Sequence, residues 1–262
     1  MSKKQGSSVA SKGCFRLVRG LVKLFYPKVT IEGLEHLPKD GAIIVGNHTQ
    51  MNGPICGELY FPGKCKTWCA YQMMYLKEVP PYAYQDFWSG KPGYIRWFYK
   101  LLSYVIAPIA VAVFNNAKTI PVYHDARIIS TFRDTLKELQ EDTKVIIFPE
   151  CYEHYNHILY QFQDKFVDVA KLYYKKTGKA LQFVPLYIAP KLHKMYLGKP
   201  VAFCPENPIE EERKRICEYL MKEITDMAVK LPEHIVVPYA NISKREYNTN
   251  KVGVNIDEKT DL

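Results

Sequence analysis

The chain has 262 residues, of which 47% are hydrophobic and 24% are charged, which is the balance of a folded globular protein. This length is ample for a buried core without disulfide or metal staples, and the composition excludes collagen-like, coiled-coil and low-complexity architectures. Seven of the nine net positive charges fall in residues 1–28, which contain no acidic residue, so the rest of the chain lacks the basic face of a nucleic-acid binder and we predict no nucleic-acid partner.

The basic N-terminal segment is typical of an amphipathic helix. Within Cys14–Tyr26, large apolar residues recur near helical spacing, and Arg16, Arg19 and Lys23 fall between them. Such a helix can lie in the headgroup region of a membrane and attract anionic lipid; alternatively, it packs its apolar face on the domain. Charges interrupt the apolar run and no small-residue cleavage site follows, which is not typical of a secretory signal peptide.

Short β-rich runs then alternate with helical patterns. In chain order we predict strands at Val29–Ile31 and Ala42–Gly46, a helix at Pro54–Phe61, a strand at Cys65–Ala70, helical or irregular structure at Trp97–Phe114, a strand at Lys118–Val122, a helix at Ala126–Gln140, a strand at Lys144–Phe148, a helix at Phe162–Lys176, strands at Gln182–Ile188 and Pro200–Phe203, and a helix starting at Asn207-Pro208.

This alternation predicts a single α/β domain with a mixed, largely parallel sheet flanked by helices, preceded by the basic amphipathic N-terminal helix. The predicted boundaries are 1–28 for the N-terminal arm, 29–240 for the α/β domain and 241–262 for a polar, loosely ordered tail. The longest apolar run, Leu101–Phe114, has 14 residues and contains Pro108. A membrane span needs about 20, so we expect a buried element or a hydrophobic ridge resting on a membrane.

Cysteine usage indicates a reducing compartment. There are seven cysteines, an odd number, and Cys65 and Cys69 form a CxxxC pair without a second pair at zinc-finger spacing. We therefore expect free, buried or half-buried thiols.

Candidate chemistry lies at the ends of the predicted strands. The chain has no GxSxG, GxxxxGK[ST], GxGxxG or HExxH motif, which disfavours serine hydrolases, P-loop NTPases and Rossmann dehydrogenases. His48 follows the buried strand Ala42–Gly46, where ligands bind in α/β sheets. A histidine there is suited to general-base chemistry near neutral pH, and the alternative is a hydrogen-bonded structural residue.

Four segments in order resemble the sequence blocks of the glycerolipid (lysophospholipid) acyltransferases, over about residues 20–205. The approach Val29–His48 (VTIEGLEHLPKDGAIIVGNH) is similar to the segment that leads into the first block of that family, NHx4D. The blocks themselves are matched in order by Asn47-His48, Thr119–His124, Phe148-Pro149-Glu150 and Val184-Pro185-Leu186.

The resemblance implies transfer of a fatty acyl group from an acyl-CoA or acyl-carrier-protein thioester to a lipid hydroxyl, with no permanently bound cofactor. It implies His48 as general base and Glu150 as a catalytic and acceptor-site residue. His124 and Arg127 are then further candidates for acceptor binding. It also implies a peripheral enzyme at the cytoplasmic face of a membrane.

Several residues depart from the family pattern. The position of the block-one aspartate holds Gly53, with Asn52 beside it. Either another acid such as Glu58 or Glu150 orients His48, or the chemistry is slow or absent. His124 replaces the block-two arginine, and Cys151-Tyr152-Glu153 follows Glu150 in place of Gly-Thr-Arg. Fewer phosphate-binding arginines favour a neutral or zwitterionic lipid, or another hydroxyl or amine, as acceptor.

We expect the site around His48 to be supported by Asn47, Asn52 and Glu58. The competing hypothesis for the function is a catalytically silent lipid- or acyl-binding protein that retains the fold. The cluster of Glu150, Glu153, His154 and His157 matches no common zinc spacing, so we predict no metal site.

Overall fold

The computed structural model describes residues 9–251, which cluster into two compact units. The smaller unit comprises residues 9–27 and 67–133, and the larger comprises 28–66 and 134–251. The division falls within one strand, β3 (Cys65–Ala70), and one helix, α5 (Ile128–Gln140).

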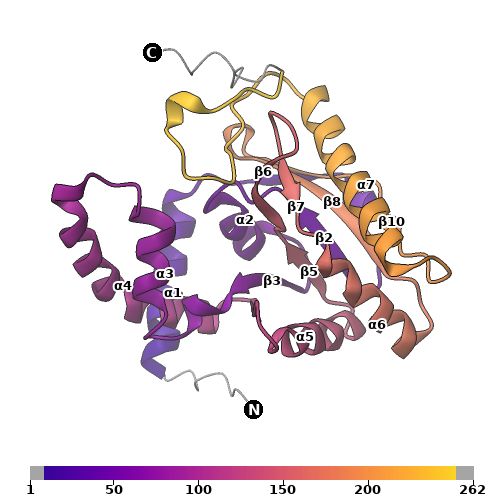
Figure 1. Ribbon diagram of the computed structural model, residues 1–262, viewed down its shortest axis with the longest axis horizontal. Coiled ribbons are helices and arrows are strands. Elements are labelled where there is room, and N and C mark those ends of the chain that lie inside the picture. The colour runs from indigo at the N-terminus through magenta and orange to yellow at the C-terminus, as the bar shows by residue number, and fades with distance from the viewer. Residues whose placement is uncertain (1–8, 252–262) are drawn as a thin grey trace. The chain divides into compact units, whose positions relative to one another are not determined.

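The larger unit is built on a mixed sheet (Figure 1). Its strands are β1 (Thr30–Glu32), β2 (Ala42–Gly46), β5 (Lys144–Ile147), β8 (Gln182–Ala189), β9 (Lys194–Leu197) and β10 (Val201–Ala202). β2 lies between β5 and β8 and is parallel to both, while β9 and β10 pair antiparallel with β8, and β1 pairs parallel with β9. Every residue of β2 and β5 is buried, as expected for strands covered on both faces.

Three helices and a hairpin complete the larger unit. They are α2 (Asn52–Tyr60), α6 (Asp168–Thr177), α7 (Ile209–Lys230) and the antiparallel pair β6 (Glu150–His154) and β7 (Tyr160–Phe162). Short 3-10 turns cover Leu34–His36, Lys165–Val167, Pro190–Leu192 and Lys244–Glu246. α7 runs along β8 (Figure 1) and buries Ile216, Leu220 and Ile224, so its apolar stripe covers the sheet as its sequence pattern predicts.

The smaller unit is mostly helical. It contains α1 (Val9–Phe25), α3 (Val79–Ala83), α4 (Arg96–Asn116) and β4 (Thr119–Val122), which pairs parallel with β3, together with 3-10 turns at Tyr71–Met74 and Gly93–Ile95 and a π-turn at Tyr84–Trp88. Val79, Ala83 and Ala107 form the small core between α3 and α4. α1 packs on α4, where Asn116 donates a hydrogen bond of 2.7 Å to Ser11 Oγ.

The predicted fold class is confirmed: the chain is an α/β protein with a mixed, largely parallel sheet flanked by helices, and a helix at Val9–Phe25 precedes the sheet. The predicted N-terminal arm begins with residues 1–8, which lie outside the described residues, as does the end of the predicted tail, 252–262. The domain boundaries at 28 and 240 stay a prediction.

Two element predictions need correction. Phe162 belongs to β7 and not to the following helix, which begins at Asp168, because Phe162 pairs with Glu150 across the hairpin. The segment Trp97–Phe114, predicted to be helical or irregular, lies within α4, which continues through Pro108. Residues Gly93–Asn116 are long and apolar enough, by length and composition alone, to cross a membrane, which corrects the prediction that no segment has that length.

Candidate functional site

The site begins at Asn47, directly after the carboxyl end of β2. Its side chain is buried and forms two hydrogen bonds with one residue of β8: Nδ2 donates to the Ile188 carbonyl at 3.0 Å, and Oδ1 accepts from the Ile188 N–H at 2.7 Å. The amide thus extends the sheet ladder by one step. These bonds fix where the chain leaves the sheet, and the role of Asn47 in supporting the site around His48 stays a prediction.

His48 occupies the turn between β2 and α2. Thr49 and Gln50, the next two residues, are in the left-handed region with φ of 48° and 56°, which is costly for residues with side chains. Asn52 closes this turn, because its Nδ2 donates to the Thr49 carbonyl at 2.8 Å. The strained turn places the imidazole at the edge of the sheet where the strands carrying three of the four sequence blocks end.

Gly53 has no room for a side chain. Its N–H donates to the His48 carbonyl at 3.0 Å, and a Cβ built on Gly53 would lie 2.4 Å from that carbonyl oxygen and 3.1 Å from Cε1 of Phe148. An aspartate at this position would require the backbone to move. The tight packing of this turn therefore explains why no carboxylate stands at position 53.

Glu150 reaches the turn from β6. Its buried carboxylate accepts the His48 backbone N–H at Oε2, 2.6 Å away, and the Tyr160 backbone N–H at Oε1, 3.0 Å away. Burial raises the pKa of this carboxyl to about 7, and the two N–H donors oppose that shift. Glu150 thus joins the turn after β2 to the β6–β7 hairpin through backbone groups.

The His48 ring is neutral at pH 7. Burial lowers its pKa to about 4, and the backbone of Gln50 opposes the shift. Nδ1 is buried and has no hydrogen-bond partner among residues 9–251, so neither Glu58 nor Glu150 orients the ring through this nitrogen. Two aromatic rings meet it edge-on instead, Phe148 with centroids 5.4 Å apart and Tyr239 at 5.6 Å.

Tyr239 was not predicted from the sequence. It lies in a segment that folds back over the turn, where Gln50 Nε2 donates to the Ala240 carbonyl at 3.2 Å and to the Tyr247 hydroxyl at 2.9 Å. A loosely ordered tail was expected from residue 241. This prediction is wrong as far as Asn250, whose side chain is fully buried. The polar side chains of this segment form hydrogen bonds with the rest of the larger unit. The sequence contains no periodic pattern that would have predicted this packing.

The candidate acceptor residues His124 and Arg127 belong to the smaller unit, whereas His48 and Glu150 belong to the larger. His124 is exposed. Arg127 forms a two-pronged ion pair with Asp125, with Nη2 2.7 Å from Oδ2, and lies 4.5 Å from the ring centroids of Tyr71 and Tyr123. This pairing lowers the pKa of Asp125 to about 2. The guanidinium of Arg127 is thus already bound by Asp125 and the two tyrosine rings of the smaller unit.

None of the remaining predicted residues forms a hydrogen bond with Nδ1 of His48. Glu58 is half-buried on α2. In the β6–β7 hairpin, the His154 ring packs on Tyr160 at 4.2 Å, and His157 Nε2 lies 3.5 Å from the Asn250 carbonyl oxygen. Among residues 9–251, no group of three His, Cys, Asp or Glu side chains is placed to hold a metal ion.

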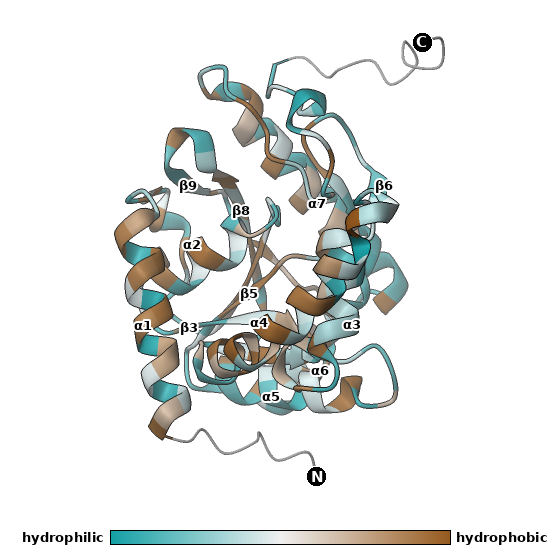
Figure 2. Ribbon diagram, turned by 90° about the vertical axis from the view of Figure 1, so that its left-hand side faces the viewer, coloured by the Kyte–Doolittle hydropathy of each residue, from teal (hydrophilic) through white to brown (hydrophobic). Residues whose placement is uncertain are grey.

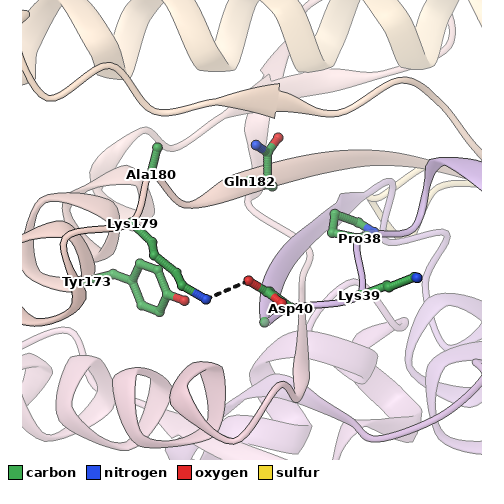
Figure 3. A pocket seen from close by; sticks show the side chains of 8 residues that line it. Pro38, Lys39, Asp40, Tyr173, Lys179, Ala180 and Gln182 are labelled. Atoms are coloured by element: carbon green, nitrogen blue, oxygen red, sulfur yellow. Dashed lines mark hydrogen bonds and ion pairs between the residues drawn. The ribbon is translucent and has the colours of Figure 1, made fainter.

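A pocket of about 210 Å³ lies at the other edge of the sheet in the larger unit (Figure 3). Gly41 and Gln182, which line it, stand at the amino ends of the parallel strands β2 and β8. Lys179 and Asp40 form an ion pair across its mouth at 2.9 Å. Because His48 follows the carboxyl end of β2, this pocket is separate from the candidate site.

Comparison with known proteins gives distant structural similarity and no match in sequence. No family model matches the chain, and no curated protein matches its sequence. Among solved structures, the chain is similar to the 1-acyl-sn-glycerophosphate (LPA) acyltransferase PlsC from Thermotoga maritima, with 17% sequence identity, a TM-score of 0.45, and coverage of 85% of this chain and 80% of that one. The similarity is confined to the fold.

Proposed function

We propose that the chain is an acyltransferase that moves a fatty acyl group from an acyl-CoA or acyl-carrier-protein thioester to a hydroxyl of a glycerolipid-type acceptor, with His48 as general base. One observation carries the proposal: three blocks that the sequence matches independently meet in the larger unit. Asn47 binds Ile188 on the strand of the fourth block, and Glu150 of the third block binds the N–H of His48.

The neutral imidazole of His48 supports the base role. In the proposed step it takes the proton of the acceptor hydroxyl as that oxygen bonds to the thioester carbonyl carbon; the carbon–sulfur bond then breaks, and the departing thiolate receives the proton. A ring with a pKa of about 4 is unprotonated throughout the physiological range, although its lowered basicity makes each proton transfer less favourable.

The acceptor that fits these residues has no phosphomonoester. Arg127, the arginine nearest the second block in the sequence, already pairs with Asp125, and the third block lacks its arginine. We propose a neutral or zwitterionic lipid, or another hydroxyl or amine, for which two arginines are not needed.

Action at a membrane is supported by the smaller unit. α1 exposes Leu17 and Leu24 at 65% and 74% beside basic residues, and α4 exposes Trp97 and Tyr104 at 68% and 67%. Figure 2 shows apolar and polar residues interleaved along α1. Exposed apolar side chains beside cations suit an anionic membrane surface. None of the seven cysteines, which all lie among the described residues, forms a disulfide, which fits the cytoplasmic face.

A second function is favoured by a specific observation. Nδ1 of His48 has no hydrogen-bond partner within the described chain, and position 53 leaves no space for an orienting carboxylate. A catalytically silent protein that binds lipid or acyl chains would need neither. Thiol release from acyl-CoA with and without lysolipid acceptors, measured for the wild type beside His48→Ala, separates the two functions.

A further inference from the structure

Residues 234–250 form a closed loop, called the C-terminal strap below. Its base is tied at Asn250, whose Nδ2 donates to the Ala228 carbonyl at 2.8 Å and whose Oδ1 accepts the His234 N–H at 2.8 Å. The Asn250 N–H in turn donates to the His234 carbonyl at 3.0 Å. Both ends of the strap are therefore fixed at one point of the larger unit.

Tyr239 lies in the C-terminal strap and is held from several sides. Its ring centroid is 5.1 Å from that of Tyr152 and 5.7 Å from that of Tyr160, both on the β6–β7 hairpin. The next residue, Ala240, accepts a hydrogen bond from Gln50, which stands two residues after His48. The strap and the His48 turn are thus hydrogen-bonded to each other beside the Tyr239 ring.

The Tyr239 ring stands against the imidazole of His48 at an interplanar angle of 85°. Phe148 meets the same imidazole at 77°. Gly53 contributes no side chain, and Nδ1 has no hydrogen-bond partner among the described residues. The two aromatic rings, together with the backbone of Gln50, therefore restrict how the imidazole turns.

We propose that Tyr239 is a positioning residue, whose ring, held by the C-terminal strap, fixes the orientation of the His48 imidazole in place of a carboxylate. The catalytic consequence rests on the proposed acyl transfer, whereas the positioning itself does not. Edge-to-face geometry between aromatic rings is directional, and a ring over the imidazole also excludes water from it. The titratable groups that face this region are Glu150 and Tyr152 on β6, Tyr160 on β7, and Tyr239 and Tyr247 of the strap.

The first test follows the His48 imidazole directly by NMR in histidine-labelled protein, with His48→Gln to assign its signal. Burial is the main cause of the lowered pKa of His48, so Tyr239→Ala should raise this pKa by about one unit or more toward the ordinary value. Tyr239→Phe keeps the ring and should leave it unchanged. The buried His234 reports whether the fold is intact. An unchanged His48 titration in Tyr239→Ala overturns the proposal.

Tyr239→Leu provides a second variant if the alanine variant does not fold. Leucine keeps an apolar side chain but no ring, so it should shift the His48 signals in the same direction as alanine, and signals like those of the wild type would refute the positioning role.

The second test is kinetic. We expect kcat to fall about tenfold or more in Tyr239→Ala with KM unchanged, since small misplacement of a reacting group is costly, and Tyr239→Phe should retain activity. An unchanged kcat beside a shifted His48 signal would overturn the catalytic consequence. A shifted signal in a protein without acyl transfer would uphold the positioning and count against the proposed function, so the two failures are distinguishable.

Discussion

Gly53 shows how one residue determines the electrostatics of its neighbour. Because position 53 carries no side chain, the turn can close tightly, with the Gly53 N–H bound to the His48 carbonyl. A side chain there would collide with that carbonyl oxygen. The imidazole is then surrounded by Phe148 and Tyr239. The low pKa of His48 is a consequence of this packing, since burial is its largest cause.

This packing predicts that Gly53→Ala lowers the free energy of unfolding by about 1–3 kcal/mol, the usual cost of forcing an extra methyl into a packed site. Gly53→Asp should be destabilising as well and should not increase activity. Gly20→Ala in α1 is the matched control: no described heavy atom lies within 4 Å of its added Cβ, and alanine favours a helix by up to about 1 kcal/mol over glycine. Denaturant midpoints would contradict the prediction if both alanine variants were equally stable.

At the scale of elements, α1 has two apolar stripes instead of one. Phe15, Val18 and Val22 are half-buried on the side of Ser11, which bonds to α4. Leu17, Leu24 and their neighbours remain exposed. The two possibilities left open by the sequence are therefore compatible, because one stripe packs on the protein while the other is available to a membrane.

The exposed stripe predicts membrane binding that single charges weaken. Leu17→Glu or Leu24→Glu should reduce flotation with anionic liposomes severalfold, because each puts a carboxylate where an apolar side chain would meet acyl chains. The control is Leu172→Glu on α6, which replaces a leucine of 39% exposure in the larger unit and should float like the wild type. Equal flotation of all three variants would contradict membrane binding through α1.

The sequence was most informative where local pattern and burial agree. The bounds of β2 and β3 were predicted to the residue. β2 is a buried apolar run, and the turn residues Pro62-Gly63 precede β3. The β6–β7 hairpin was missed, since its residues are polar and aromatic without alternation. In the site, the turn position of His48 followed from its strand, but the contact with Tyr239 joins residues far apart in the sequence and could not be predicted without the fold.

At the scale of the whole molecule, His48 and Glu150 affect stability in opposite directions as pH changes. The folded state lowers the pKa of His48 to about 4, so between this value and about 6.5 the unfolded chain binds more protons and stability rises with pH. The folded state raises the pKa of Glu150 to about 7, so from about 4.5 upward the folded chain binds more protons and stability falls with pH.

The contributions of His48 and Glu150 to the free energy of unfolding should largely cancel in the wild type between about pH 5 and 6.5. Variants that lack one of the two groups should show the contribution of the other. In Glu150→Gln only the His48 contribution remains, so the free energy of unfolding should rise with pH. In His48→Gln it should fall with pH. Each slope is at most about 1.4 kcal/mol per pH unit, the linkage of one proton. Chemical denaturation at several pH values gives both slopes, and slopes of the same sign and size would contradict these pKa shifts.

Acyl transfer with His48 as base is tested by acceptor-dependent thiol release from acyl-CoA, and from acyl-carrier-protein thioesters, by the full chain with mixed neutral and zwitterionic lysolipids. We expect release by the wild type that needs an acceptor, is lost in His48→Ala and persists in the control His36→Ala. His36 lies in the Leu34–His36 turn, which precedes β2, whereas His48 follows it. Release that continues unchanged in His48→Ala, or no release from either donor, would contradict the assignment of His48 as the base of an acyltransferase.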